Sequence, residues 1–369
     1  MQLNKIKLHS CTTFASAQSQ ITLDDDYNVP DYRPDIVKVL KEKGELQFDE
    51  VKAAAGAAWL KGRLVFKVLY RSDQDNAKIS CLKGEIPFQE KLNMDGVQEY
   101  DVIQASGEIE DLTIGVIHSR KISVRAVILL KTEEPREKED ELCVGIEADD
   151  GCEKRYRNTN ILQLLCMKRD QCRQKSEITL PSSKPNVQEI LWKSLEIRNL
   201  DTKMGQDGVK LSGEVLISVL YQEEEETDRV QWYETVIPLD CGVECDAGTE
   251  ADIIYKVKAR PASMELEVKP DYDGEERVLV LELVMNLDIR VWKEQEISML
   301  EDVYSLKQEI IPVCTGVTLH HISVKNDSQC RLTEQMELAE SQEKILQICS
   351  CEGTVHLENT ELTEQGVRA

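Results

Sequence analysis

The chain contains an internal repeat with a period of 151 residues, and this repeat constrains its fold more than any other feature. The segment GRLVFKVLY at 62–70 recurs as GEVLISVLY at 213–221, and an I-P-[FL] turn and an [RK]-P-[DN] stretch keep the same spacing. A repeat of this length is a domain rather than a solenoid unit. The chain therefore holds two complete modules, and we interpret features that occur in both as framework.

Alternating apolar residues predict strands in both modules. Leu64, Phe66, Val68 and Tyr70 would share one face of an extended segment, and the second copy repeats that face at 215–221. We therefore expect a mainly β fold. Each of the two tandem homologous modules would be an antiparallel β-sandwich or a partly open barrel with short helices.

The short helices are expected where Asp or Asn follows a proline, because these residues favour a helix start. This pattern predicts one or two helical turns at 35–40 and at 186–191.

The pattern also gives boundaries along the chain. We expect an N-terminal segment at 1–18, the first module at 19–135, a linker at 136–175, the second module at 176–295, a linker at 296–335 and an incomplete third module at 336–369. The third unit would stop just before the strand that begins at Gly62 in the first copy. The sequence is therefore expected to be a fragment, a truncated chain, or a chain whose tail is ordered by packing on the second unit.

The charge of the chain excludes several partners. A formal net charge of −24 and a pI near 4.7 disfavour nucleic acid and anionic membranes. No apolar run has the length of a membrane span or of a signal peptide, so we expect a cytoplasmic protein. One basic island, at 154–157, 168–169 and 173–175, is either a solvated linker face or a docking site for an acidic partner.

The twelve cysteines do not follow the repeat. Cys241 and Cys245 correspond to Glu90 and Met94 in the first copy, and no C-x-x-C pair occurs. A repeated disulfide framework would repeat its cysteines, so we expect reduced and scattered thiols.

Two acidic clusters are candidates for an ion site. Asp24, Asp25 and Asp26 form one, and the stretch 271–276 forms the other. Neither has the spacing of a calcium loop. The Asp273-Gly274 pair is better explained by a hairpin turn, whereas the aspartate triplet stays open as an ion site or a charged rim.

Catalytic motifs and phosphate-binding loops are missing from the sequence, so we expect neither an enzyme nor a cofactor. The two tyrosines of the repeat are candidates for a binding face, for the core or for the rim of a sheet. Comparison of the copies leaves eight residues as the expected repeat framework: Pro34, Gly62, Tyr70, Pro87, Pro185, Gly213, Tyr221 and Pro238. The residues that bind a partner are not predicted.

The repeated motifs resemble those of a known family. They are the stretch NVPDYRPDI at 28–36, the G-x-x-x-x-x-V-L-Y strand, the I-P-[FL] turn, LPSSKPN at 180–186 and PDYDGEER at 270–277. In this order they resemble the SPOCS-domain spore-coat morphogenetic proteins, and most closely the SipL-like members.

The resemblance implies a noncatalytic scaffold on the mother-cell side of the forespore surface. Relatives bind the ATPase that forms the basement layer of the spore coat, and many carry a C-terminal LysM module that this sequence lacks. We therefore expect an adaptor in bacterial spore coat assembly. The alternative is a carbohydrate-binding or hydrolytic protein that acts on the glycan of the spore cortex.

Overall fold

The computed structural model describes residues 2–72, 78–147, 151–224, 229–246, 253–307, 309–322, 331–338, 344–345, 348, 353, 359–363 and 366–368. Strands and their connections make up this part of the chain, and it contains no helix. It accordingly has no helical segment that is long and apolar enough to cross a membrane.

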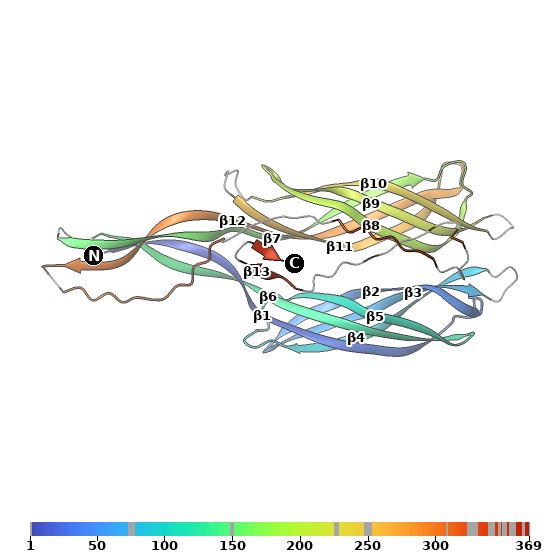
Figure 1. Cartoon of the computed structure of the whole chain (residues 1–369), viewed down its shortest axis with the longest axis horizontal. Helices are drawn as coiled ribbons and strands as arrows, with labels where there is room; N and C mark the ends of the chain where they lie inside the picture. The colour runs from blue at the N-terminus through green and yellow to red at the C-terminus, as the bar shows by residue number, and fades with distance from the viewer. Residues whose placement is uncertain are drawn as a thin grey trace.

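The first module is a sandwich of two three-stranded antiparallel sheets (Figure 1). Its strands are β1 (Gln2–Asn28), β2 (Ile36–Ala54), β3 (Ala57–Ser72), β4 (Ile79–Asn93), β5 (Gln104–His118) and β6 (Lys121–Glu147). One sheet has the order β1-β6-β5 and the other the order β2-β3-β4.

The second module repeats this topology strand for strand. Its strands are β7 (Cys152–Thr179), β8 (Val187–Gly205), β9 (Gly208–Glu223), β10 (Val230–Glu244), β11 (Ile253–Pro270) and β12 (Glu276–Ser305). The sheets have the orders β11-β12-β7 and β10-β9-β8. The expected mainly β fold with two tandem antiparallel modules is confirmed, and each module is an open sandwich.

The alternating pattern buries one face of each strand between the two sheets. In β3 the side chains of Leu64, Phe66, Val68 and Tyr70 are fully buried, as the sequence predicted. They pack against Ile122 and the following alternate residues of the long strand β6. Apolar burial of this kind is the main stabilising contribution to such a core.

The helical turns expected at 35–40 and 186–191 are wrong. Ile36 begins β2 and Val187 begins β8, and both side chains are buried. The Ile36 amide donates to the carbonyl of Ser119 at 2.8 Å, so the backbone is satisfied by tertiary pairing. Strand pairing and burial therefore override the local signal for a helix start.

The stretches expected to be linkers are strands at 136–147, 152–175 and 296–305. The start of β1 with 136–147, and 152–165 with 296–305, form two antiparallel ribbons that project beyond the sandwiches, which we call the arms (Figure 1). Residues 166–175 belong to the sheet of the second sandwich. The charged residues of the arms pair across the strands, for example Lys5 with Glu141 at 2.7 Å. The sequence of these ribbons resembles a linker because it is charged and both of its faces are exposed. Pairing of side chains across the strands nevertheless stabilises it as regular structure.

The two arms pack on each other around a small apolar cluster. Leu8 and Leu142 from the first module and Ile161 from the second are buried there. The chain after β12 returns to this cluster, because Val317 and Leu319 pack against it and the His320 carbonyl accepts from the Leu162 amide at 2.8 Å. Further on, the described residues form one short hairpin, β13 (Glu361–Thr363) and β14 (Gly366–Arg368).

The sandwiches also meet through equivalent faces. Leu69 lies in one cluster with its repeat counterpart Leu220, and Ile79 lies there with its counterpart Val230. Trp192 is buried in the same cluster. In a two-fold symmetric dimer, equivalent residues of the two subunits meet in an isologous interface. The two modules of this chain meet in the same way within one chain.

Two polar contacts reinforce this interface. The Arg33 guanidinium donates two hydrogen bonds to the Glu189 carboxylate, at 2.7 and 3.2 Å, and Glu189 thereby raises the pKa of Arg33. The Lys41 ammonium lies 5.3 Å from the ring centroid of Trp192, which occupies the same repeat position in the second module. The modules are thus joined as one pseudo-symmetric unit.

Candidate functional site

The connection between the first two strands of each module is held by the repeated tyrosine. The Tyr70 hydroxyl donates to the Pro34 carbonyl at 3.1 Å, and the Tyr221 hydroxyl donates to the Pro185 carbonyl at 3.2 Å. Both tyrosines are fully buried, and burial raises the pKa of Tyr70 to about 12. The structure thus brings together the proline and the tyrosine expected as framework and places the tyrosine in the core.

An arginine that the sequence analysis missed completes this connection. Arg120 donates to the carbonyls of Val29, Pro30 and Arg33 at 3.1, 2.9 and 2.6 Å. In the second module Arg277 donates to the carbonyls of the turn 181–184 at 3.0 and 3.2 Å. These two arginines lie 157 residues apart rather than 151, so the main register of the repeat hid them.

The repeated glycines and the second pair of prolines lie next to each other across β3 and β4, and across β9 and β10. Gly62 pairs with Phe88 and the next residue pairs with Pro87. A side chain at Gly62 would collide with the Gln47 carbonyl. Pro87 and Pro238 lie in edge strands, where a missing amide proton breaks no ladder and discourages pairing with another chain.

The cysteines of the second module differ from the expectation of reduced, scattered thiols. Cys172 in β7 and Cys241 in β10 form a disulfide with Cα atoms 6.1 Å apart. The Cys166 and Cys245 sulfurs lie 3.5 Å apart beside it. The two sheets of the sandwich meet at this edge, which brings together residues far apart in sequence. Comparison of the copies could not find the pair, because only one module has it.

The acidic clusters do not converge. Asp24, Asp25 and Asp26 lie consecutively in β1, so their side chains alternate between the two faces, and Asp26 pairs with Lys121 at 2.7 Å. In the other cluster Asp271 accepts amides of its own turn and Gly274 has φ of 85°, as a hairpin turn requires. No group of three or more potential metal ligands occurs in the described ranges.

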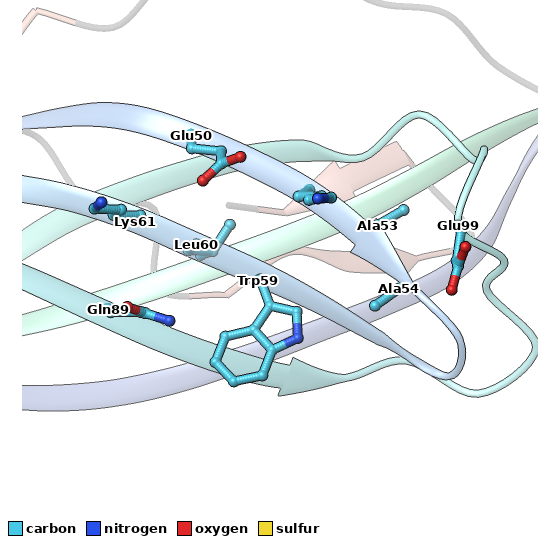
Figure 2. A pocket seen from close by; sticks show the side chains of 9 residues that line it. Glu50, Ala53, Ala54, Trp59, Leu60, Lys61, Gln89 and Glu99 are labelled. Atoms are coloured by element: carbon cyan, nitrogen blue, oxygen red, sulfur yellow. The ribbon is translucent and has the colours of Figure 1, made fainter.

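An open hollow of about 610 Å³ lies at one end of the first sandwich (Figure 2). Trp59 is the largest side chain that lines the hollow, and this residue is 40% exposed. Lys61 lies on the same strand as Trp59, whereas Glu50 and Gln89 lie on the two neighbouring strands (Figure 2). Lys91 lies 5.8 Å from the Trp59 centroid. Lys210 takes the position of Trp59 in the second module, so the hollow belongs to one module and is no part of the framework.

The basic island does not form a single patch. Its arm residue Arg155 pairs with Glu301, and Lys154 donates to the Ile146 carbonyl. Lys168 pairs with Asp170 on the inner side of β7. Arg169 and Arg173 alternate with these inward residues and point to the opposite face of the strand.

Fold and geometry define a class of protein: a pair of homologous β-sandwiches joined through equivalent faces, with a repeated Tyr–Pro and arginine clamp. A comparison with family models identifies the modules, because the model described as "SipL, SPOCS domain" matches residues 35–117 and 186–269. The chain contains two domains of the SPOCS-domain, SipL-like family, one in each sandwich, and this family match supports a role related to sporulation. Searches of curated proteins and of solved structures each found no match.

The family match covers six of the eight framework residues, three in each copy. Each matched segment begins one residue after Pro34 or Pro185 and ends at the last residues of β5 or β11. It contains the repeated glycine, tyrosine and second proline, whereas the arms lie outside it. These six residues therefore lie in the domain that the family model describes.

Proposed function

We propose that this protein is a noncatalytic adaptor in spore coat assembly. It binds the ATPase of the coat basement layer at the forespore surface, on the mother-cell side. The observation that carries the proposal is the pairing of two SPOCS domains into one unit through a buried interface. An adaptor needs a rigid body that presents distinct surfaces to distinct partners, and this pairing supplies one.

The distribution of repeated and unrepeated features supports an adaptor. The residues common to both modules serve the interior: the tyrosine is buried, the arginine binds turn carbonyls and the glycine permits close packing. The hollow at Trp59, in contrast, occurs once and lies on the surface. Duplication with divergence of the surface is how one fold acquires different binding functions on a shared framework.

A pull-down from an extract of sporulating cells tests the proposal. The tagged protein is expected to recover the coat-basement ATPase. A matched variant, Trp192→Ala, loosens the pairing of the modules and is expected to recover less of it if the paired unit is what binds. Retention on cortex glycan, or turnover of glycan, without a protein partner would instead support the carbohydrate-directed alternative and refute the adaptor.

A further inference from the structure

One sheet face of the second module concentrates positive charge on a strongly acidic chain. In the β11-β12-β7 sheet, alternate residues such as Leu287 and Ile289 point into the core, so their neighbours point outward. We call the following outward residues the basic face: Arg169, Arg173 and Lys175 in β7, Arg290 in β12, and Lys256, Lys258 and Arg260 in β11. Seven cations thus share one side of a single sheet.

Five carboxylates share this face, but they are unevenly distributed. Four of them lie at the end that holds Lys175, and Asp288 alone lies among the cations at the other end: Glu177, Glu265, Glu267 and Glu282 form the first group. Lys175 pairs with Glu282 at 3.0 Å, and Arg290 pairs with Asp288 at 3.2 Å. Although burial opposes ionisation of Asp288, hydrogen bonds from Arg290 and Gln104 hold the pKa of this carboxyl below its ordinary value. Within the part of the chain that the structure describes, the other five cations of the basic face lie in no ion pair, and all five are exposed.

The first module shows that the fold does not require this charge. The β-bulges of β1 and β7 fall at the same repeat position, and so do those of β5 and β11. Each residue of the basic face can therefore be matched to one residue in the β1-β6-β5 sheet of the first module. The counterparts of the seven cations in the first module are Gln18, Thr22, Asp24, Glu133, Gln104, Ser106 and Glu108. None of them is basic, so the positive charge is specific to one face of one module.

A cleft of about 480 Å³ adjoins the basic face where the two modules diverge. Arg169, Lys258 and Arg260 line it from the second module, and Lys131 lines it from the first. The Gln104 amide donates to the Asp288 carboxylate at 3.1 Å across the junction. Three carboxylates, those of Glu133, Asp170 and Asp288, also line the cleft, so its four cations leave it weakly positive. It offers a concave entrance next to the basic face.

We propose that the basic face and its cleft bind an acidic, extended polypeptide segment of a partner protein. Alternate residues of one strand are about 7 Å apart, so the cations of β7 and β11 form rows with the period of alternate carboxylates in an extended chain. Charge complementarity of this kind sets orientation and partner choice. An adaptor needs a surface that binds a partner, and the basic face would be such a surface. The positions of its cations do not depend on which protein supplies the acidic segment.

An anionic bilayer fits this surface less well than a polypeptide. The net charge of −24 repels a membrane that approaches the whole molecule, whereas a narrow segment needs only the local charge within a Debye length of about 8 Å. The first module also borders the cleft with the Glu133 carboxylate, which disfavours an anionic surface there. An extended polypeptide is narrow enough to enter the cleft, whereas a bilayer surface is not.

The test uses a fluorescent ten-residue peptide of alternating Glu and Ser, with a Gln and Ser peptide as the uncharged control. Fluorescence anisotropy should show binding of the Glu peptide to the full chain and progressive loss of binding with salt. The variant Arg169→Gln/Lys258→Gln/Arg260→Gln should weaken this binding by about tenfold, or about 1.4 kcal/mol, because it removes three exposed ion pairs that each contribute little. Its thermal unfolding should not change, because all three side chains are exposed.

The matched control is Lys52→Gln/Lys61→Gln/Lys91→Gln, which removes the same charge around the Trp59 hollow and should bind the peptide like the unaltered protein. Equal binding by both triple variants, or equal loss, would overturn the proposal. So would tighter binding to vesicles of phosphatidylglycerol than to the peptide, or salt-sensitive self-association that the Arg169 variant abolishes. Peptide binding and recovery of the coat ATPase are separate measurements, so either proposal can fail while the other stands.

Discussion

The hydroxyl of Tyr70 donates a hydrogen bond to the carbonyl of Pro34, and the second module repeats the contact 151 residues later between Tyr221 and Pro185. Each contact fixes the chain where it crosses from one sheet of the sandwich to the other. Because Tyr70 and Tyr221 are fully buried and the prolines are half-buried, loss of the bond would leave a proline carbonyl without this partner.

Removal of the hydroxyl should destabilise the module that contains it. We expect Tyr70→Phe to lower the free energy of unfolding by about 1–2 kcal/mol, and Tyr221→Phe to act similarly on the second module. Urea denaturation followed by circular dichroism measures the change. Tyr32→Phe serves as the control, because that side chain is 81% exposed, and an equal loss of stability in this variant would contradict the account.

The same tyrosine predicts a loss of stability at alkaline pH. Burial raises the pKa of Tyr70 from 10.0 to about 12 in the folded protein. Between these values the unfolded chain releases the proton and the folded chain keeps it, so the contribution is full below pH 10 and is lost as the pH rises towards 12. Thermal unfolding at several pH values should show a smaller decline over this range for Tyr70→Phe than for the unaltered protein. An identical decline in both proteins would refute the assignment.

Trp59 and Trp192 should differ sharply in their contribution to stability. Trp192 is buried between the modules, so Trp192→Ala should cost about 3 kcal/mol and separate the unfolding of the two modules. Trp59 lies in the open hollow, so Trp59→Ala should change stability by less than about 0.5 kcal/mol. Calorimetry of both variants makes the comparison. A larger loss in the Trp59 variant would mean that the interface is misplaced.

The bidentate pair between Arg33 and Glu189 should couple the modules. The double-mutant cycle Arg33→Ala, Glu189→Ala and both together should give a coupling free energy of about 0.5–1 kcal/mol, since both side chains are partly exposed. The coupling should shrink in high salt. Strictly additive single changes at low salt would show that the two side chains do not interact.

The sequence predicted the fold through features that repeat. The spacing of Gly62 and Tyr70 to their second copies established the two modules, and the alternation of apolar residues established the strands. Local sequence signals gave the wrong secondary structure where pairing with a distant strand determines the backbone conformation. The start of β2 after Pro34 has a helix-start sequence, yet its backbone pairs with the neighbouring strand.

The surface was harder to predict than the framework. Arg120 and Arg277 escaped notice because extra residues in the β11–β12 turn shift the register of the repeat. The sequence shows Arg169 and Arg173 as part of a basic island. Lys256, Lys258 and Arg260 alternate with apolar residues, so they share one face of their strand, but the sequence does not show that this strand joins the sheet of Arg169. Which strands share a sheet is a non-local property, so the basic face emerged only from the topology.

The location of the protein in sporulating cells tests the central claim most directly. A fluorescent fusion is expected to form a ring around the forespore in cells that contain the coat-basement ATPase, and to disperse in cells that lack it. Diffuse fluorescence in the first cells, or a ring that persists in the second, would contradict the proposed adaptor.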